Sequence, residues 1–328
     1  MFLCCGDALY DLFISDDNAS SPNHNSPNHG SPSHTSPSHV TLAGDIGGSP
    51  LNVAVGLARL GQKSRYLTKL SSDLYGQRMR EFIKRNNIDA DLSIDSDLNT
   101  TLAIVEKQAD GSARYVFYTD NTADVSLQQN ELPDQLPPDI RVVHVGSYST
   151  AVDPTSTTLI KLTERETGNR IISYDPNLRP SIEPDIDHWR SVFNAHAATA
   201  NLIKASDEDI ETLLGSNRED QFVADCFSHG AQLVFITRGP DGASGYKPDG
   251  SQVKVPGVKV DVVDTVGAGD TFQAATLHWL QAEGHLTGSN NIEGDVDVQA
   301  SMDFAIRAAA VTCTRAGADL PALAELAN

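Results

Sequence analysis

Residues 260–281 contain the segment of this chain that is best suited to chemistry. Their sequence, VDVVDTVGAGDTFQAATLHWLQ, predicts a strand that ends near Asp264, a turn of small residues, and an apolar helix from Thr271. Small residues let the backbone approach an anion closely, and the unpaired N–H groups at the start of a helix point toward it. The turn at 267–270 therefore predicts a phosphate site.

Asp270 closes this turn and stands in the first turn of the predicted helix. A carboxylate beside a phosphate opposes binding, but it serves phosphoryl transfer if it accepts the proton of the attacking hydroxyl. The alternative is an ordinary acidic residue at a helix start. The sequence contains neither a GxxxxGK[ST] loop nor a GxGxxG fingerprint, which excludes two common nucleotide sites. We interpret Asp270 as a general base.

The elements that must position this segment alternate along the chain. From residue 141 onward, helical patterns separate four strand-like runs, RVVHVGS, RIISYDP, ATANLIKAS and AQLVFITRG. Such alternation predicts right-handed βαβ units and a parallel sheet that helices cover on both faces. The earlier segment TTLAIVEKQADGSARYVFY breaks the pattern, because its two strand-like runs flank a turn at 109–111 and predict a hairpin.

The expected fold class is α/β, with three α/β/α layers, a mainly parallel central sheet and a small β-sheet lid. We expect one domain over residues 1–328, with the lid contributed by roughly 9–20, 40–46 and 98–120. Four tandem pentapeptides, SPNHN, SPNHG, SPSHT and SPSHV, fill residues 21–40. Their prolines and their scarcity of apolar residues predict a flexible loop near the lid rather than a folded metal site, although their histidines could hold nickel or zinc adventitiously.

Composition limits the partners of the chain. Its 44 acidic and 24 basic side chains give a net charge of −20, which argues against nucleic acid and membrane partners. ATP remains compatible, because helix N-termini and a metal ion can hold phosphate locally. The sequence has no apolar stretch of membrane length and no basic lead of a signal peptide, and its four cysteines suit reduced thiols. These features indicate a cytoplasmic protein.

Two segments of the sequence resemble the signatures of one enzyme family. DTVGAGDTF resembles the C-terminal signature of the ribokinase family, also called the phosphofructokinase B family of carbohydrate kinases, and GGSPLNVAVGLARLG resembles its N-terminal signature. The resemblance covers nearly the whole chain and implies a ribokinase-like fold. It makes Asp270 the catalytic base beside an anion hole formed by Gly267, Ala268 and Gly269. It also implies that the sugar is bound by Asp11, Gly47, Gly48, Asn52 and Arg179.

The same resemblance implies cofactors and the residues that bind them. ATP contacts are expected at Lys204, Asp209, Thr237, Gly239, Gly242, Gly267 and Gly269. Asp209 falls on the acidic position that helps to organise Mg2+ indirectly in relatives, but Ser206 stands where some relatives carry Asn, so a simple helix cap is an equal alternative. Asp264 and the turn at 315–317 match the neighbourhood of a monovalent cation, so K+ is expected beside ATP and Mg2+.

The sugar is suggested by local similarity. YDPNLRP at 174–180 resembles a segment of fructokinases and of 2-keto-3-deoxygluconate kinases, and Arg179 suits a carboxylate, sugar oxygens or neighbouring acids. NVAVGLARLG and GDALYDLF look more like bacterial fructokinases. The expected reaction is therefore transfer of the γ-phosphate of MgATP to a hydroxyl of fructose. The alternatives are a 2-keto-3-deoxygluconate kinase, another sugar or nucleoside kinase of the family, and a non-catalytic sugar-binding regulatory protein.

Lids of this family often pair, so a homodimer through the lid is expected.

Overall fold

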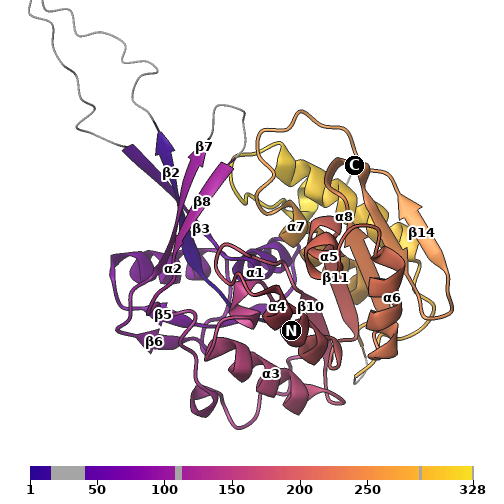
Figure 1. The fold of residues 1–328 in the computed structure, drawn as a ribbon, viewed down its shortest axis with the longest axis horizontal. Helices are drawn as coiled ribbons and strands as arrows, with labels where there is room; N and C mark the ends of the chain where they lie inside the picture. The colour runs from indigo at the N-terminus through magenta and orange to yellow at the C-terminus, as the bar shows by residue number, and fades with distance from the viewer. Residues whose placement is uncertain (16–40, 108–112, 288–289, 327–328) are drawn as a thin grey trace, which may run out of the picture.

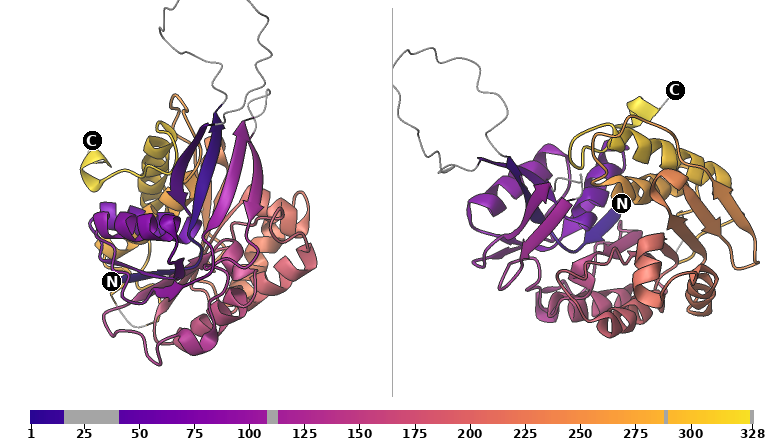
Figure 2. Two further views of the ribbon diagram at one scale, coloured as in Figure 1. Left: turned by 90° about the vertical axis from the view of Figure 1, so that its left-hand side faces the viewer. Right: turned by 45° about the horizontal axis from the view of Figure 1, so that its top comes forward.

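The computed structural model of the chain describes residues 1–15, 41–107, 113–287 and 290–326. The histidine-containing repeat at 21–40 lies outside the described residues. Two sheets dominate the fold, a large one inside the layered part of the molecule and a small one that stands away from it (Figures 1 and 2). This arrangement confirms the expected three-layer α/β/α fold with an additional small β-sheet.

The central sheet has eight strands in the order β14-β13-β12-β11-β10-β9-β1-β4. The six strands from β12 to β4 pair in parallel, and only β13 and β14 are antiparallel at one edge. In chain order the strands are β1 (Phe2–Cys5), β4 (Ser64–Leu67), β9 (Val142–Gly146), β10 (Ile171–Asp175), β11 (Leu202–Ser206), β12 (Leu233–Thr237), β13 (Ala243–Tyr246) and β14 (Gln252–Val255). The predicted mainly parallel sheet is confirmed.

Helices cover both faces of this sheet, and each face has its own apolar core. One core is formed with α1 (Ser49–Arg59), α2 (Leu74–Arg85), α7 (Ala268–Ala282) and α8 (Val298–Cys313). The other is formed with α3 (Thr155–Glu166), α4 (Ile186–Ala197), α5 (Asp207–Leu214) and α6 (Glu219–Ser228). Because successive strand residues point to opposite faces, the adjacent Cys4 and Cys5 belong to different cores.

The small sheet has the order β3-β2-β7-β8. Its strands are β2 (Leu9–Ser15), β3 (Thr41–Gly47), β7 (Thr101–Lys107) and β8 (Ala113–Tyr118), and β7 and β8 pair as the predicted antiparallel hairpin. A third sheet joins β5 (Lys69–Ser71) in parallel to β6 (Ile94–Ser96). Short 3-10 turns complete the fold: η1 (Gln129–Glu131), η2 (Tyr148–Thr150), η3 (Gly239–Asp241) and η4 (Leu323–Leu326).

The parallel arrangement brings several polar residues to one edge of the central sheet. β10 ends at Asp175, β11 at Ser206 and β12 at Thr237, and the carboxyl ends of parallel strands lie at the same edge. The small sheet is continuous with β1 through the short connection at 6–8.

Among the described residues, no helix is both long and apolar enough to cross a membrane.

Candidate active site

The start of α7 is the turn for which we expect an anion site. Gly267 is its N-cap in the left-handed region, with φ 77°, and a Cβ there would lie 2.7 Å from the Cβ of Ala318. Glycine is therefore required by both conformation and packing. The helix begins at Ala268, earlier than the predicted start at Thr271, so Ala268 and Gly269 lie in the first helical turn and Gly267 precedes it as the N-cap. The N–H of Ala268 donates to the Thr265 carbonyl at 3.2 Å. This end of α7 carries the positive end of the helix dipole.

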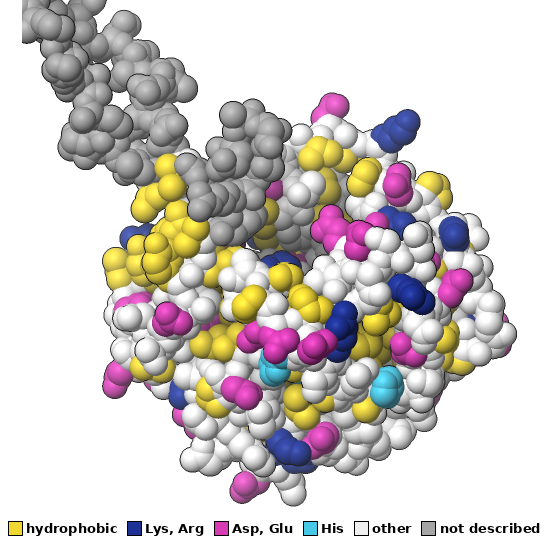
Figure 3. Space-filling view, in the orientation of Figure 1, with side chains coloured by type: hydrophobic (Ala, Val, Ile, Leu, Met, Phe, Trp, Pro, Cys, Tyr) yellow, Lys and Arg dark blue, Asp and Glu magenta, His cyan; other side chains and the backbone are white. Residues whose placement is uncertain are grey.

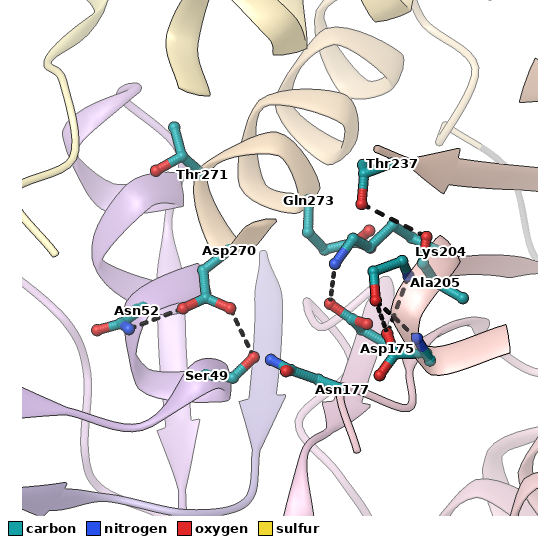
Figure 4. Close-up of polar contacts among 12 residues, drawn as sticks. Ser49, Asn52, Asp175, Asn177, Lys204, Ala205, Thr237, Asp270, Thr271 and Gln273 are labelled. Atoms are coloured by element: carbon teal, nitrogen blue, oxygen red, sulfur yellow. Dashed lines mark hydrogen bonds and ion pairs between the residues drawn. The ribbon is translucent and has the colours of Figure 1, made fainter. Parts of the chain in front are cut away.

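Asp270 lies in this first turn with only 6% of its surface exposed, and two side chains of α1 hold it (Figure 4). The Ser49 hydroxyl donates to Oδ1 at 2.7 Å, and the Asn52 amide donates to Oδ2 at 2.8 Å. Each carboxylate oxygen thus has one donor, which fixes the orientation of the group. An oriented, buried carboxylate at the N-terminal end of a helix can accept a proton from a hydroxyl.

The two donors reach Asp270 because they share one face of α1. Ser49 and Asn52 are three residues apart in the first turn of the helix, and side chains at that spacing are neighbours. Asn52, for which we expect a sugar contact, also holds the carboxylate of Asp270 in this structure. Ser49 was missed by the sequence interpretation, although its spacing from Asn52 was visible.

The glycine pair before α1 allows the small sheet to approach closely. A Cβ at Gly47 would lie 2.5 Å from Oδ2 of Asp11 on β2. Gly48 has φ 114°, and a Cβ there would lie 2.3 Å from the carbonyl oxygen of Asp7. Gly48 therefore excludes larger residues, because both its backbone conformation and the Asp7 backbone oppose a Cβ, and the close approach at Gly47 places Asp11 directly beside the start of α1.

Asp11 and Arg179 influence each other electrostatically at this place. Burial raises the pKa of Asp11 to about 7, and the Arg179 guanidinium opposes the rise. Neighbouring carboxylates raise it further: Asp45, Asp264 and Asp270. Among the described residues Arg179 forms no ion pair, and its guanidinium donates to the Leu178 carbonyl at 2.8 Å. Its positive charge therefore remains available to a ligand.

Lys204 and Asp175 form a buried ion pair on neighbouring strands. The Lys204 ammonium donates to Oδ2 of Asp175 at 2.9 Å, and the two side chains are 4% and 0% exposed. A Cβ built on Gly269 would lie 3.1 Å from this ammonium nitrogen, so Lys204 reaches the first turn of α7. Burial raises the pKa of Asp175 to about 6, although Lys204 opposes that rise. Asp175 was also missed by the sequence interpretation.

Asp209 is a helix-capping residue in this structure. Its Oδ2 accepts from the N–H and the hydroxyl of Ser206 at 2.9 and 2.7 Å, and its backbone N–H donates back to the Ser206 hydroxyl at 3.0 Å. Its Oδ1 accepts from the N–H of Leu178 at 2.8 Å. The carboxylate thus accepts from three donors, and Ser206 and Asp209 together form a capping box at the start of α5.

The turn after β12 brings the other expected nucleotide contacts to the same sheet edge. Gly242 has φ 91°, and a Cβ there would lie 2.1 Å from the carbonyl of Val255, so its glycine is explained by packing. Gly239 has φ 48°, and a Cβ there would meet no atom within 4 Å. Among the described residues, the Thr237 hydroxyl makes one long side-chain contact, 3.5 Å, to the Ala205 carbonyl. Thr237 and Gly239 are thus the members of this turn left open to a ligand.

Asp264 joins two turns beside α7. Its Oδ1 accepts from the N–H of Val266 at 3.1 Å, and its Oδ2 accepts from the N–H of Gly317 at 3.0 Å. The structure therefore brings Asp264 together with the 315–317 turn. In the part of the chain that the structure describes, no group of three or more His, Cys, Asp or Glu side chains is arranged to hold a metal ion.

Residues 16–325 match the pfkB family of carbohydrate kinases. The chain belongs to this family, which is the class of enzyme that its two signatures and its fold indicate. It is 36% identical to a fructokinase of Rhizobium leguminosarum bv. trifolii over 287 residues, which cover 88% of this chain and 82% of that protein.

Solved structures show the same fold. An uncharacterised sugar kinase of Pyrococcus horikoshii in complex with ATP has TM-score 0.77 and 26% identity, with 99% of this chain and 96% of that chain covered. A fructokinase double mutant of Vibrio cholerae O395, bound to fructose, ADP and potassium ion, has TM-score 0.80 and 22% identity, with the same shares covered. The expected ribokinase-like fold is thereby confirmed.

Proposed function

We propose that this chain is an ATP-dependent fructokinase that transfers the γ-phosphate of MgATP to a hydroxyl of fructose. The observation that carries the proposal is the placement of Asp270, which Ser49 and Asn52 hold in the first turn of α7. Fructokinases among the relatives and structural neighbours support fructose as the sugar.

In the proposed reaction, Asp270 accepts the proton of the attacking hydroxyl while that oxygen forms a bond to the γ-phosphorus. The bond between the γ-phosphorus and the bridging oxygen of ATP breaks, and ADP leaves. The N–H groups of the turn at 267–269 stabilise the charge on the transferring phosphoryl group. Asp11 and Arg179 bind sugar hydroxyls, and their charges already interact at this place.

ATP and its metal ions fit the charges of the site. Around the Lys204 ammonium, burial opposes a high pKa, but nearby carboxylates raise it above its ordinary value: Asp175, Asp209 and Asp270. Three carboxylates against one ammonium leave an excess of negative charge, which a triphosphate can approach only together with a cation. Mg2+ would neutralise phosphoryl oxygens and keep several waters, so Asp209 would act on it through water at most. K+ would lie beside Asp264.

The small sheet supports a role as lid and as dimer contact. It carries Asp11 to the site, so its closure over the sugar would exclude water and suppress ATP hydrolysis. Hydrophobic side chains gather on it in the space-filling view (Figure 3), and Leu42, Val116 and Tyr118 on β3 and β8 are 48%, 42% and 59% exposed. A second copy of the chain could cover this surface.

ATP use and the free cysteines fit a cytoplasmic location.

The proposal is tested by coupled measurement of ADP formation with MgATP and a panel of fructose, 2-keto-3-deoxygluconate, ribose and adenosine. We expect the highest kcat/KM for fructose, and phosphorus NMR of the product identifies the hydroxyl. A preference for the keto acid would assign carboxylate binding to Arg179, whose lack of an ion pair among the described residues leaves that possibility open. Sugar binding without turnover of any member would point to a regulatory protein.

A further inference from the structure

The buried pair of Lys204 and Asp175 is not explained by stability. Its side chains are 4% and 0% exposed, and removing two charges from water costs several kcal/mol each, so a buried ion pair is weak evidence for stabilisation. Well-packed apolar residues often replace such pairs without loss. A buried ammonium that is retained at the carboxyl edge of a parallel sheet needs another reason.

The position of the ammonium supplies that reason. Lys204 reaches the first turn of α7, where a Cβ on Gly269 would lie 3.1 Å from its nitrogen. An ammonium has three donors, and its hydrogen bond to Asp175 uses one of them. The ammonium also lies beside the N-terminal end of α7 at Gly269. A full positive charge and the helix dipole therefore converge on one place, where a phosphoryl group would bind.

Asp175 controls this ammonium. Its Oδ2 accepts from Lys204, while its Oδ1 is buried and has no partner among the described residues. Among the described residues, the Asp175 carboxylate therefore has one side-chain hydrogen bond, from Lys204. A lysine side chain is flexible, and burial lowers its pKa, so without a fixed carboxylate it would lose both its place and its charge. Burial is the largest single influence on the pKa of Lys204, and the carboxylate of Asp175 is the largest of the charges that oppose it.

We infer that Lys204 is a catalytic residue that binds the transferring phosphoryl group, and that Asp175 is the positioning residue that holds the Lys204 ammonium against Gly269. This inference rests on the proposed phosphoryl transfer and assigns a role to Asp175 that the ATP contacts alone do not require. As the phosphoryl group leaves ADP, negative charge on its oxygens moves toward the ammonium, so the contact is strongest in the transition state.

The first test is Lys204→Met in the full chain, with Lys69→Met as a matched control. Lys69 also pairs with an acid, Glu131 at 2.8 Å, but on β5 and outside the site. We expect Lys204→Met to lower kcat by about 100- to 1,000-fold with little change in the KM for fructose. Lys69→Met should keep kcat within about 2-fold. A rise in the KM for ATP alone, with kcat unchanged, would overturn the catalytic role.

The second test is Asp175→Asn, measured as kcat against pH. Loss of the carboxylate lets burial lower the pKa of Lys204, so the alkaline limb of the profile should move to lower pH by at least about one unit. A merely structural role would lower stability and leave that limb in place. An unmoved limb, or activity restored by raising Mg2+, would overturn the positioning role.

Gly269→Ala provides a third test, which leaves both Lys204 and Asp175 in place. It decides the question even if the two variants of the buried pair fail to fold. Gly269 is helical, alanine favours a helix, and the added methyl meets only the end of the Lys204 side chain. We expect a folded enzyme with kcat lowered about 10-fold or more and fructose binding retained. Unchanged kcat would contradict the inference. If the wild-type chain phosphorylates no sugar of the panel, the proposed function fails instead, which separates the two failures.

Discussion

Replacement of Ser49 by alanine tests how the catalytic carboxylate is held. The change removes the 2.7 Å hydrogen bond to Oδ1 of Asp270 and leaves the 2.8 Å bond from Asn52 to Oδ2. A hydrogen bond to a charged group contributes about 1.5–3 kcal/mol. At about 1.4 kcal/mol for each factor of ten, we expect kcat/KM for fructose to fall by about 10- to 150-fold.

The assay is steady-state ADP formation, with two comparisons that isolate the hydrogen bond. Ser301→Ala removes another fully buried serine hydroxyl, which has no partner among the described residues, and should leave kcat/KM within about 2-fold. In an Asp270→Ala background, Ser49→Ala should have almost no further effect, because the two residues act through one bond. An equal loss in both backgrounds, or no loss in the wild-type background, would refute the reasoning.

Three further predictions concern stability. Gly48→Ala should lower the free energy of unfolding in denaturant by at least about 2 kcal/mol, because its Cβ would lie 2.3 Å from the Asp7 carbonyl at φ 114°. Burial raises the pKa of Asp7 to about 7 from an ordinary 3.8, so the folded state holds this proton more tightly. The stability that this adds is full below about pH 4 and is lost as pH rises through 7, at about 1.4 kcal/mol per pKa unit. Asp7→Asn should remove this dependence from unfolding curves measured between those limits, and a persisting slope would assign it elsewhere. Ser206→Ala should cost about 1 kcal/mol of unfolding free energy by loss of the cap, with kcat changed by less than about 3-fold; a much larger loss of kcat would give the α5 start a role beyond capping.

Much of the fold could be predicted from sequence because it depends on local periodicity. Strand alternation put Cys4 and Cys5 on opposite faces, and each lies in a different core. The alternation of strands and helices after residue 141 gave the parallel sheet, and the turn at 109–111 gave the β7–β8 hairpin. The start of α7 was placed too late, because the glycines at 267 and 269 weaken the local helix signal, while Gly267 takes the left-handed N-cap conformation from which the helix begins at Ala268.

The contacts inside the site could not be predicted in the same way, because they join segments far apart in sequence. Asn52 and Asp270 are separated by 218 positions, so spacing alone could not show that the amide holds the carboxylate. The pair of Asp175 and Lys204 depends on strand register: Tyr174 pairs with Ile203, which places the next residue of each strand side by side. Register between parallel strands is fixed by packing of the whole sheet, and no local pattern in either strand reveals it.

The central claim is that Asp270 accepts the proton of a fructose hydroxyl, and the most direct test is fructose-dependent ADP formation by Asp270→Asn beside the wild-type chain. Asparagine keeps the size of the side chain but cannot accept the proton at neutral pH. We predict strong turnover by the wild-type enzyme and a kcat at least about 1,000-fold lower in the variant, with fructose and ATP binding retained in calorimetry. A variant that keeps more than about a tenth of wild-type kcat would contradict the account.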